Sequence, residues 1–127
     1  MKLAYTIARL LLGAIFLFFG SNLFLNFLHA PMPAGIMGQF SGALFASHFI
    51  YAVALFQVVP GILLLVNRYV PLGLALLAPV IVSICLVHIL MAPSGLPVAA
   101  LVAIFWFLVA YRVRSAFAGL FQERVSD

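Results

Sequence analysis

Acidic side chains are almost missing from this sequence of 127 residues. The two carboxylates, Glu123 and Asp127, both lie at the C-terminal end, and no Asp or Glu interrupts the apolar part of the chain. Proton relays in membranes usually employ buried carboxylates, and hydrolytic sites set a nucleophile beside a base that an acid orients. The sequence therefore excludes a carboxylate relay, and it gives hydrolysis no support.

Cysteine and metal-ligand spacings are equally scarce. Cys85 is the single cysteine, so the chain has neither an internal disulfide nor a CxxC pair for dithiol redox chemistry. None of the three histidines, His29, His48 and His88, lies three or four residues from another, and no acid lies near them in the sequence. We therefore predict no metal site and no catalytic residue, with the histidines as weak ligand candidates only.

What the sequence has in abundance is apolar residues. Hydrophobic residues make up 68% of the chain and charged residues 6%, against about half and a quarter in soluble domains. The mean hydropathy is +1.34. The net charge of +4 is spread over the chain ends and one turn, whereas nucleic-acid binding needs clustered basic residues. This composition predicts an integral membrane protein whose partner is the lipid bilayer, with no nucleic acid.

Four apolar stretches are each about long enough to cross a hydrocarbon core of roughly 30 Å. The sequence predicts an all-α fold, a single transmembrane domain over residues 1–127 that forms a bundle of four membrane-spanning helices. Residues 30–41 hold prolines and glycines and predict a loop, so the second helix begins at Gly42 or Ala46. We place the helices near residues 4–28, 45–66, 70–91 and 96–113, with a short cytoplasmic tail over 114–127.

The second and third helices form a hairpin that turns at Asn67, Arg68 and Tyr69. Small residues let membrane helices approach closely, so we expect packing contacts at four glycines. These are Gly13, Gly20, Gly61 and Gly73. Pro60 precedes Gly61 and is expected to kink the second helix.

The basic residues predict the orientation. With four crossings and a cytoplasmic N-terminus, all of them fall on the inner side, and the outer loops contain no Lys or Arg. The residues are Lys2, Arg9, Arg68, Arg112, Arg114 and Arg124. Both termini are therefore predicted to be cytoplasmic. We expect the amphipathic tail to lie on the inner surface, with Phe117, Leu120 and Phe121 toward lipid.

In this orientation the polar residues of the membrane helices gather in the outer half. An amide or imidazole in hydrocarbon needs a partner, which favours a pocket in which Gln57 and His88 share a cavity. Near-interface residues can also be polar at little cost, and Arg9 can snorkel to the inner interface, so a purely structural interpretation stays open. The pocket-lining candidates are Arg9, Asn22, Gln57, Ser83 and His88.

Over nearly its whole length the chain resembles bacterial DoxX-like membrane proteins. Arg9 with the Gly13 and Gly20 spacing, the hairpin PGILLLVNRYVPLG, and LAPVIV followed by His88 carry this resemblance. It implies four transmembrane helices in the bacterial cytoplasmic membrane. Some relatives are subunits of thiosulfate–quinone oxidoreductases or of membrane redox complexes. Relatives usually carry Glu where Gln57 stands and Asn where Ser83 stands, so we carry over Arg9, Gln57 and His88 as pocket candidates only.

Two kinds of function fit these observations. The first is a non-catalytic subunit or scaffold of a membrane complex, with a membrane or redox protein or a second copy of the chain as partner. The alternative is a quinone-linked redox component, or a binder or transporter of a small lipophilic molecule. Quinone is the one cofactor that the resemblance implies, and the residues themselves predict none.

Overall fold

The chain folds almost entirely into helices. A computed structural model describes residues 2–26 and 31–123, and within them the helices are α1 (Lys2–Leu25), α2 (Gly35–Ala46), α3 (Phe49–Val66), α4 (Val70–Leu90) and α5 (Leu96–Arg112), with 3₁₀ helices η1 (Pro93–Gly95) and η2 (Arg114–Phe121). Four of them, α1, α3, α4 and the segment from η1 through α5, are long and apolar enough to cross a membrane. The predicted all-α fold with four membrane-spanning helices is confirmed.

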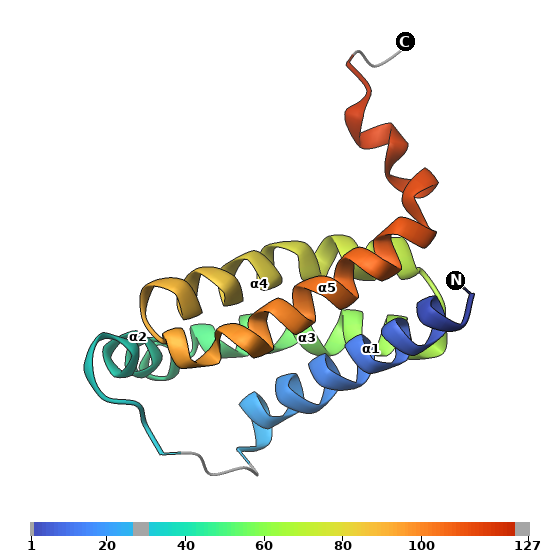
Figure 1. The fold of residues 1–127 in the computed structure, drawn as a ribbon. Helices are drawn as coiled ribbons and strands as arrows, with labels where there is room; N and C mark the ends of the chain where they lie inside the picture. Colours follow the sequence, from blue (N-terminus) through green and yellow to red (C-terminus); the bar gives the residue numbers. More distant parts are fainter. Residues whose placement is uncertain (1, 27–30, 124–127) are drawn as a thin grey trace.

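The four long helices lie side by side around one apolar core (Figure 1). α1 packs against α3 and α5, and α4 packs against the same two helices, so the bundle closes into a ring. The largest fully buried side chains fill its centre: Leu12, Leu64, Leu74, Leu77, Val109 and Pro60. Most other large apolar side chains are exposed on the outside, as expected where the surrounding solvent is lipid.

α1 and α3 approach one another at glycines, as the sequence predicts. A Cβ added at Gly13 would lie 2.9 Å from the carbonyl oxygen of Gly61, and one added at Gly61 would lie 2.8 Å from the backbone nitrogen of Leu17. A Cβ at Gly20 would lie 2.9 Å from the Cβ of Gln57. These contacts are tighter than a side chain allows, so Gly13, Gly20 and Gly61 form the contact between the two helices.

Arg9 ties the same two helices at the carboxyl end of α3. Its side chain is 8% exposed, and its Nη1 donates to the carbonyl oxygen of Leu64 and, at 3.5 Å, to that of Leu65. The last carbonyls of a helix lack intrahelical partners, and a cation there is favourable to the helix dipole. Arg9 therefore points inward and caps α3, so the snorkelling interpretation does not apply to it.

Residues 35–46 correct the expectation of a loop over residues 30–41. They form α2, which ends at Ala46, and α3 begins at Phe49, whereas one continuous helix was expected from residue 45. Twelve residues of helix span about 18 Å, too short to cross a bilayer. A helix nevertheless satisfies its own backbone hydrogen bonds where water is scarce, and glycine is common in membrane helices, so these glycines do not mark a loop.

Ser47 and His48 separate α2 from α3. His48 adopts a left-handed conformation with φ of 64°, which ends the helical path. The hydroxyl of Ser47 then accepts the N–H of Phe49 at 3.2 Å, which satisfies one of the first N–H groups of α3. The apolar run is thus divided at Ser47 and His48 into two helices, α2 and α3, with different directions.

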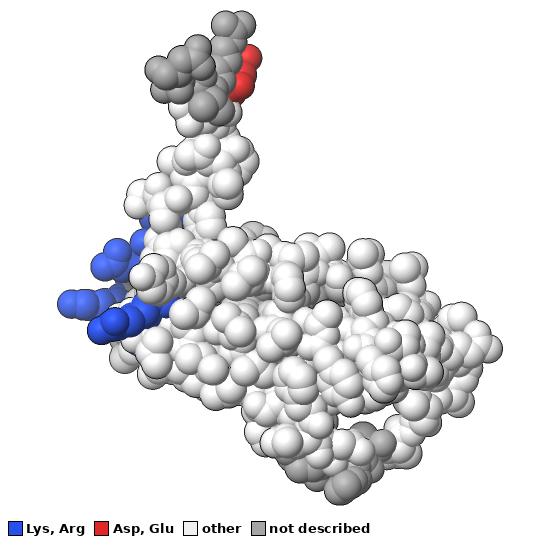
Figure 2. Space-filling model, turned by 180° about the vertical axis from the view of Figure 1, so that it is seen from behind, with Lys and Arg blue, Asp and Glu red and all other residues white. Residues whose placement is uncertain are grey.

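The basic side chains gather at one end of the bundle (Figure 2). This basic end holds the start of α1, the turn between α3 and α4, and the end of α5, with Lys2, Arg68, Arg112 and Arg114. Arg124 lies outside the described residues. α2 lies at the opposite end, and η2 leaves the basic end across the direction of the long helices (Figure 1).

The glycine contacts predict unequal effects of one substitution. Gly61→Ala should lower the free energy of unfolding by about 1–3 kcal/mol, because its Cβ would meet backbone atoms of α1 that cannot move aside. Gly73→Ala is the matched control, since its Cβ would lie 3.5 Å from the nearest atoms, an ordinary contact. Thermal unfolding in detergent measures both; equal losses would contradict the assigned role of Gly61.

Candidate functional site

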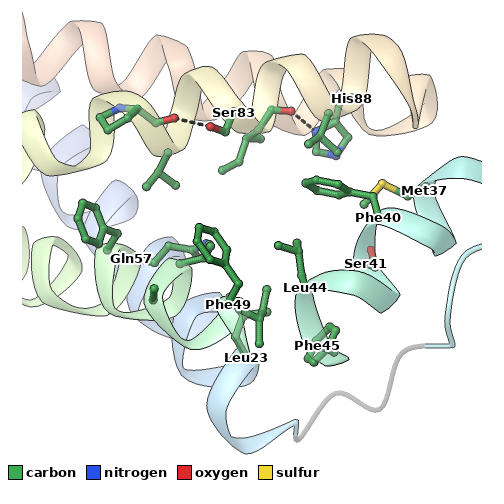
Figure 3. A pocket seen from close by; sticks show the side chains of 18 residues that line it. Leu23, Met37, Phe40, Ser41, Leu44, Phe45, Phe49, Gln57, Ser83 and His88 are labelled. Carbon is green, nitrogen blue, oxygen red and sulfur yellow. Dashed lines mark hydrogen bonds between the residues drawn. The ribbon is translucent and has the colours of Figure 1, made fainter. Parts of the chain in front are cut away.

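A cavity of about 550 Å³ opens between α2, α3 and α4, at the end of the bundle away from the basic end. The cavity is of a size typical for small-molecule pockets. α3 and α4 form two facing walls, and α2 closes the end between them (Figure 3). Leu23 is the lining residue that α1 contributes.

The cavity walls are mainly apolar. Four phenylalanines contribute most of the aromatic surface: Phe40 and Phe45 from α2, and Phe49 and Phe56 from α3. Four polar side chains interrupt this surface: Ser41, Gln57, Ser83 and His88. Apolar walls with a few convergent polar groups are the usual form of a small-molecule site.

Gln57 stands on the α3 wall, facing the α4 wall that carries Ser83 and His88 (Figure 3). Gly20 of α1 lies directly behind the Cβ of Gln57, where only a glycine fits. The Gln57 side chain therefore lies between the α1–α3 contact and the cavity. The residue is 9% exposed, and its amide makes no hydrogen bond to any of residues 2–26 or 31–123. A buried amide with both a donor and an acceptor is thus available to a molecule in the cavity.

Ser83 and His88 each bond to their own helix. The hydroxyl of Ser83 donates to the carbonyl oxygen of Pro79 at 2.8 Å. Nδ1 of His88 lies 2.7 Å from the carbonyl oxygen of Ile84. Because a carbonyl only accepts, Nδ1 carries the proton, and Nε2 of a neutral ring is then an acceptor. Because the Ser83 hydroxyl gives its proton to Pro79, its oxygen keeps its lone pairs as acceptors. Oγ of Ser83 and Nε2 of His88 are therefore the two acceptor atoms on the α4 wall.

Gly95 in η1 fixes the position of the His88 ring. A Cβ on Gly95 would overlap Cδ2 and Nε2 of the imidazole, so only glycine leaves space for the ring where it lies. The turn between α4 and α5 therefore holds His88 from one side, and the Ile84 carbonyl holds it from another.

The remaining candidates from the sequence lie elsewhere. Arg9 is bonded to α3 carbonyls and is not among the residues that line the cavity. Asn22, near the end of α1, is half-buried, and it does not line the cavity either. His48 is exposed and stacks on Tyr51, with ring centroids 5.8 Å apart. His29 lies outside the described residues.

The weak metal candidates stay separate where the structure describes them. Within residues 2–26 and 31–123, no three side chains of His, Cys, Asp or Glu come together in a group that could hold a metal ion. His48 lies in the α2–α3 turn, whereas His88 is near the end of α4. Cys85 is half-buried with a free thiol.

The α2 wall is the part of the site that the sequence did not predict. Met37, Phe40 and Leu44 line the cavity from this helix. They are three and four residues apart, which is the spacing of residues on one face of a helix. This spacing was the feature of the sequence that could have predicted α2. The prolines and glycines around them instead favoured a loop.

Comparison with protein families gives one match. The sequence model of the DoxX family matches residues 4–89, about two thirds of the chain. The matched range contains Gln57, Ser83 and His88, and it ends before η1 and α5. Comparisons with curated proteins and with solved structures gave no match.

The contact between Gly95 and His88 is testable. Gly95→Ala should displace the imidazole and lower the free energy of unfolding by about 1 kcal/mol, because the added Cβ overlaps the ring. Reaction of His88 with diethylpyrocarbonate, followed by mass spectrometry, should be faster in this variant. Gly42→Ala is the control, since nothing lies within 4 Å of its added Cβ. An unchanged rate in Gly95→Ala would show that the glycine does not hold the ring.

Proposed function

The chain belongs to the DoxX family, and from this premise we propose that it is a non-catalytic membrane protein that holds one small lipophilic molecule between α2, α3 and α4. The observation that carries the proposal is the buried Gln57 amide, which faces an apolar cavity without a hydrogen-bond partner in the described chain.

Energetics favour a ligand for this amide. Burial of an amide without a hydrogen bond costs about 1–3 kcal/mol in proteins, and the Gln57 amide is reached from the cavity, so a molecule there can supply the missing bond. A ligand with a carbonyl or hydroxyl group would satisfy the amide of Gln57, while the phenylalanines enclose its apolar part. The amide thus supplies specificity, and the walls supply most of the affinity.

The arrangement of polar groups supports a quinone-type headgroup. One ring oxygen would accept the N–H of Gln57, and a hydroxyl on the opposite side of a reduced ring would donate toward the α4 wall. On that wall Ser83 and His88 both offer acceptors. Gln57 can donate at one end of a flat ring, and Ser83 and His88 can accept a hydroxyl proton at the other. The three residues together therefore fit a quinol, whereas an oxidised quinone would be hydrogen-bonded by Gln57 alone.

Access to the cavity would be from the bilayer. Phe49 is 60% exposed and Phe56 is 48% exposed, although both line the cavity. Their exposure indicates that the wall they form continues onto the outer surface of the bundle. In a membrane that surface is in contact with lipid, which dissolves quinones and similar molecules.

The chain would carry out no redox step of its own. Reduction of a quinone takes two electrons and two protons, and a single cysteine cannot supply the electrons as a dithiol does. Turnover would require a redox protein as partner. The chain would then act as the subunit that presents the lipophilic molecule, which is also the role of a non-catalytic subunit.

We further place the protein in the bacterial cytoplasmic membrane, with the basic end inside. Lys2, Arg68, Arg112 and Arg114 lie at that end, and an excess of Lys and Arg marks cytoplasmic loops. The cavity then opens toward the outer leaflet.

Gln57→Leu tests the site. The substitution should abolish binding of a quinone analogue, and it should keep or raise the thermal stability, because an unpaired amide is replaced by an apolar side chain. Binding is measured by calorimetry on the purified protein in detergent.

Gln39→Leu is the matched control, since Gln39 is exposed on α2 and does not line the cavity. Its binding should equal that of the unchanged protein. If binding and stability fall together in Gln57→Leu, the amide is a tie between helices, and the proposed site is wrong.

Cysteine labelling tests the orientation in a Cys85→Ala background. A membrane-impermeant maleimide added outside intact cells should label a cysteine at Ala34, which is exposed before α2, because that end is proposed to face outward. A cysteine at Asn67, exposed in the α3–α4 turn, should stay unlabelled until the cells are opened. The reverse pattern would overturn the orientation.

A further inference from the structure

A second, smaller groove lies at the basic end, between the start of α1 and the end of α5. Its volume is about 140 Å³, and it is lined by Ala4, Tyr5, Leu108, Tyr111, Arg112 and Arg114. The guanidinium of Arg114 lies 4.1 Å from the centroid of the Tyr111 ring, and that of Arg112 lies 5.9 Å from the centroid of the Tyr5 ring. Two cations and two aromatic rings thus share one groove.

The groove is arranged to receive an anion. Arg114 donates from Nη1 to the carbonyl oxygen of Tyr111 at 2.7 Å, which folds its side chain back onto the groove. The other N–H groups of Arg114, and all those of Arg112, bond to no described residue. Guanidinium groups present several donors in a fixed plane that matches phosphate oxygens.

No negative charge of the described chain neutralises these cations. Figure 2 shows the Lys and Arg side chains together at this end, and the acidic side chain of Glu123 apart from them at the far end of the tail. No ion pair joins acidic and basic side chains within residues 2–26 and 31–123. The positive field of Lys2, Arg112 and Arg114 is therefore available to an external anion.

The position of the groove identifies the kind of anion. α1 begins and α5 ends beside it, so it lies where membrane-spanning helices meet the lipid headgroups. η2 then runs across the direction of the bundle, with Leu120 74% exposed and Phe121 86% exposed (Figure 1). Apolar side chains on such a segment can insert between acyl chains next to the groove.

We propose that this groove binds the phosphate of an anionic phospholipid, with Arg112 and Arg114 on the phosphate and the apolar residues of η2 against the acyl chains. The site lies outside the cavity between α2, α3 and α4, and it does not depend on the ligand of that cavity. Basic pockets between membrane helices near the headgroups are recognised ways of holding anionic lipids.

Native mass spectrometry of the full-length protein in mild detergent tests the proposal. The protein is titrated with phosphatidylglycerol and, separately, with phosphatidylcholine of the same acyl chains. We expect one phosphatidylglycerol to bind in clear preference to phosphatidylcholine. In the double variant R112Q/R114Q its affinity should fall about thirty-fold, since each guanidinium that lines the groove and contacts the phosphate is expected to contribute about a five-fold change.

Arg68→Gln is the matched control, because it removes one cation of the same end from the α3–α4 turn, outside the groove. It should keep the lipid preference. Should the double variant fail to fold, R114Q alone decides, since Arg114 is exposed and lies beyond α5; its affinity must then fall about five-fold.

Three results would overturn the proposal. Equal binding of the two lipids would show that the phosphate charge is not recognised by the groove. An equal loss in Arg68→Gln and in the groove variants would show a general attraction to the basic end. Displacement of the lipid by millimolar inorganic phosphate would show a site for free phosphate instead of a lipid.

Discussion

The structure depends on the direct backbone contact between α1 and α3. In lipid no hydrophobic effect drives apolar helices together, so association relies on close packing, and only glycine permits the approach seen at Gly13 and Gly61. That approach brings Arg9 within hydrogen-bond reach of the α3 carbonyls, and it places Gln57 against Gly20. This contact therefore caps the carboxyl end of α3 and holds the Gln57 amide of the candidate site near the middle of the same helix.

α4 explains why a cavity exists beside this pair. Near the basic end α3 and α4 are joined by a short turn, and Gly73 lies close to Pro60. Farther from the turn the lining residues of the two helices face one another across the cavity, and α2 lies between their ends (Figure 3). A hairpin that is tight at its turn and open at its other end leaves a space that no fifth membrane-spanning helix of the described chain fills.

The sequence predicts the number of helices from the length of its apolar runs, and the position of a residue along a helix from the helical rise. Four apolar runs of about 20 residues predict four crossings, and a rise of about 1.5 Å per residue predicts that Ser83 and His88 lie in the same half of their helix. The rotation of each helix about its axis does not follow from these quantities. For that reason Arg9 was placed in the pocket, although its side chain turns to α3. α2 was missed because Pro and Gly mark loops in water, whereas in lipid the backbone needs its own hydrogen bonds.

The two ends of the bundle carry different polar groups: cations at the basic end, and neutral side chains in the cavity. At the basic end the cations have no acidic partner among the described residues, which favours the proposed anionic ligand there. In the cavity, Gln57 is a neutral amide. A carboxylate at this depth would need a counter-ion, and Arg9, the buried cation of the described chain, is already bonded to Leu64 and Leu65. A neutral amide removes that requirement, which supports the proposed uncharged ligand of the cavity and leaves ionic contacts to the proposed lipid site at the basic end.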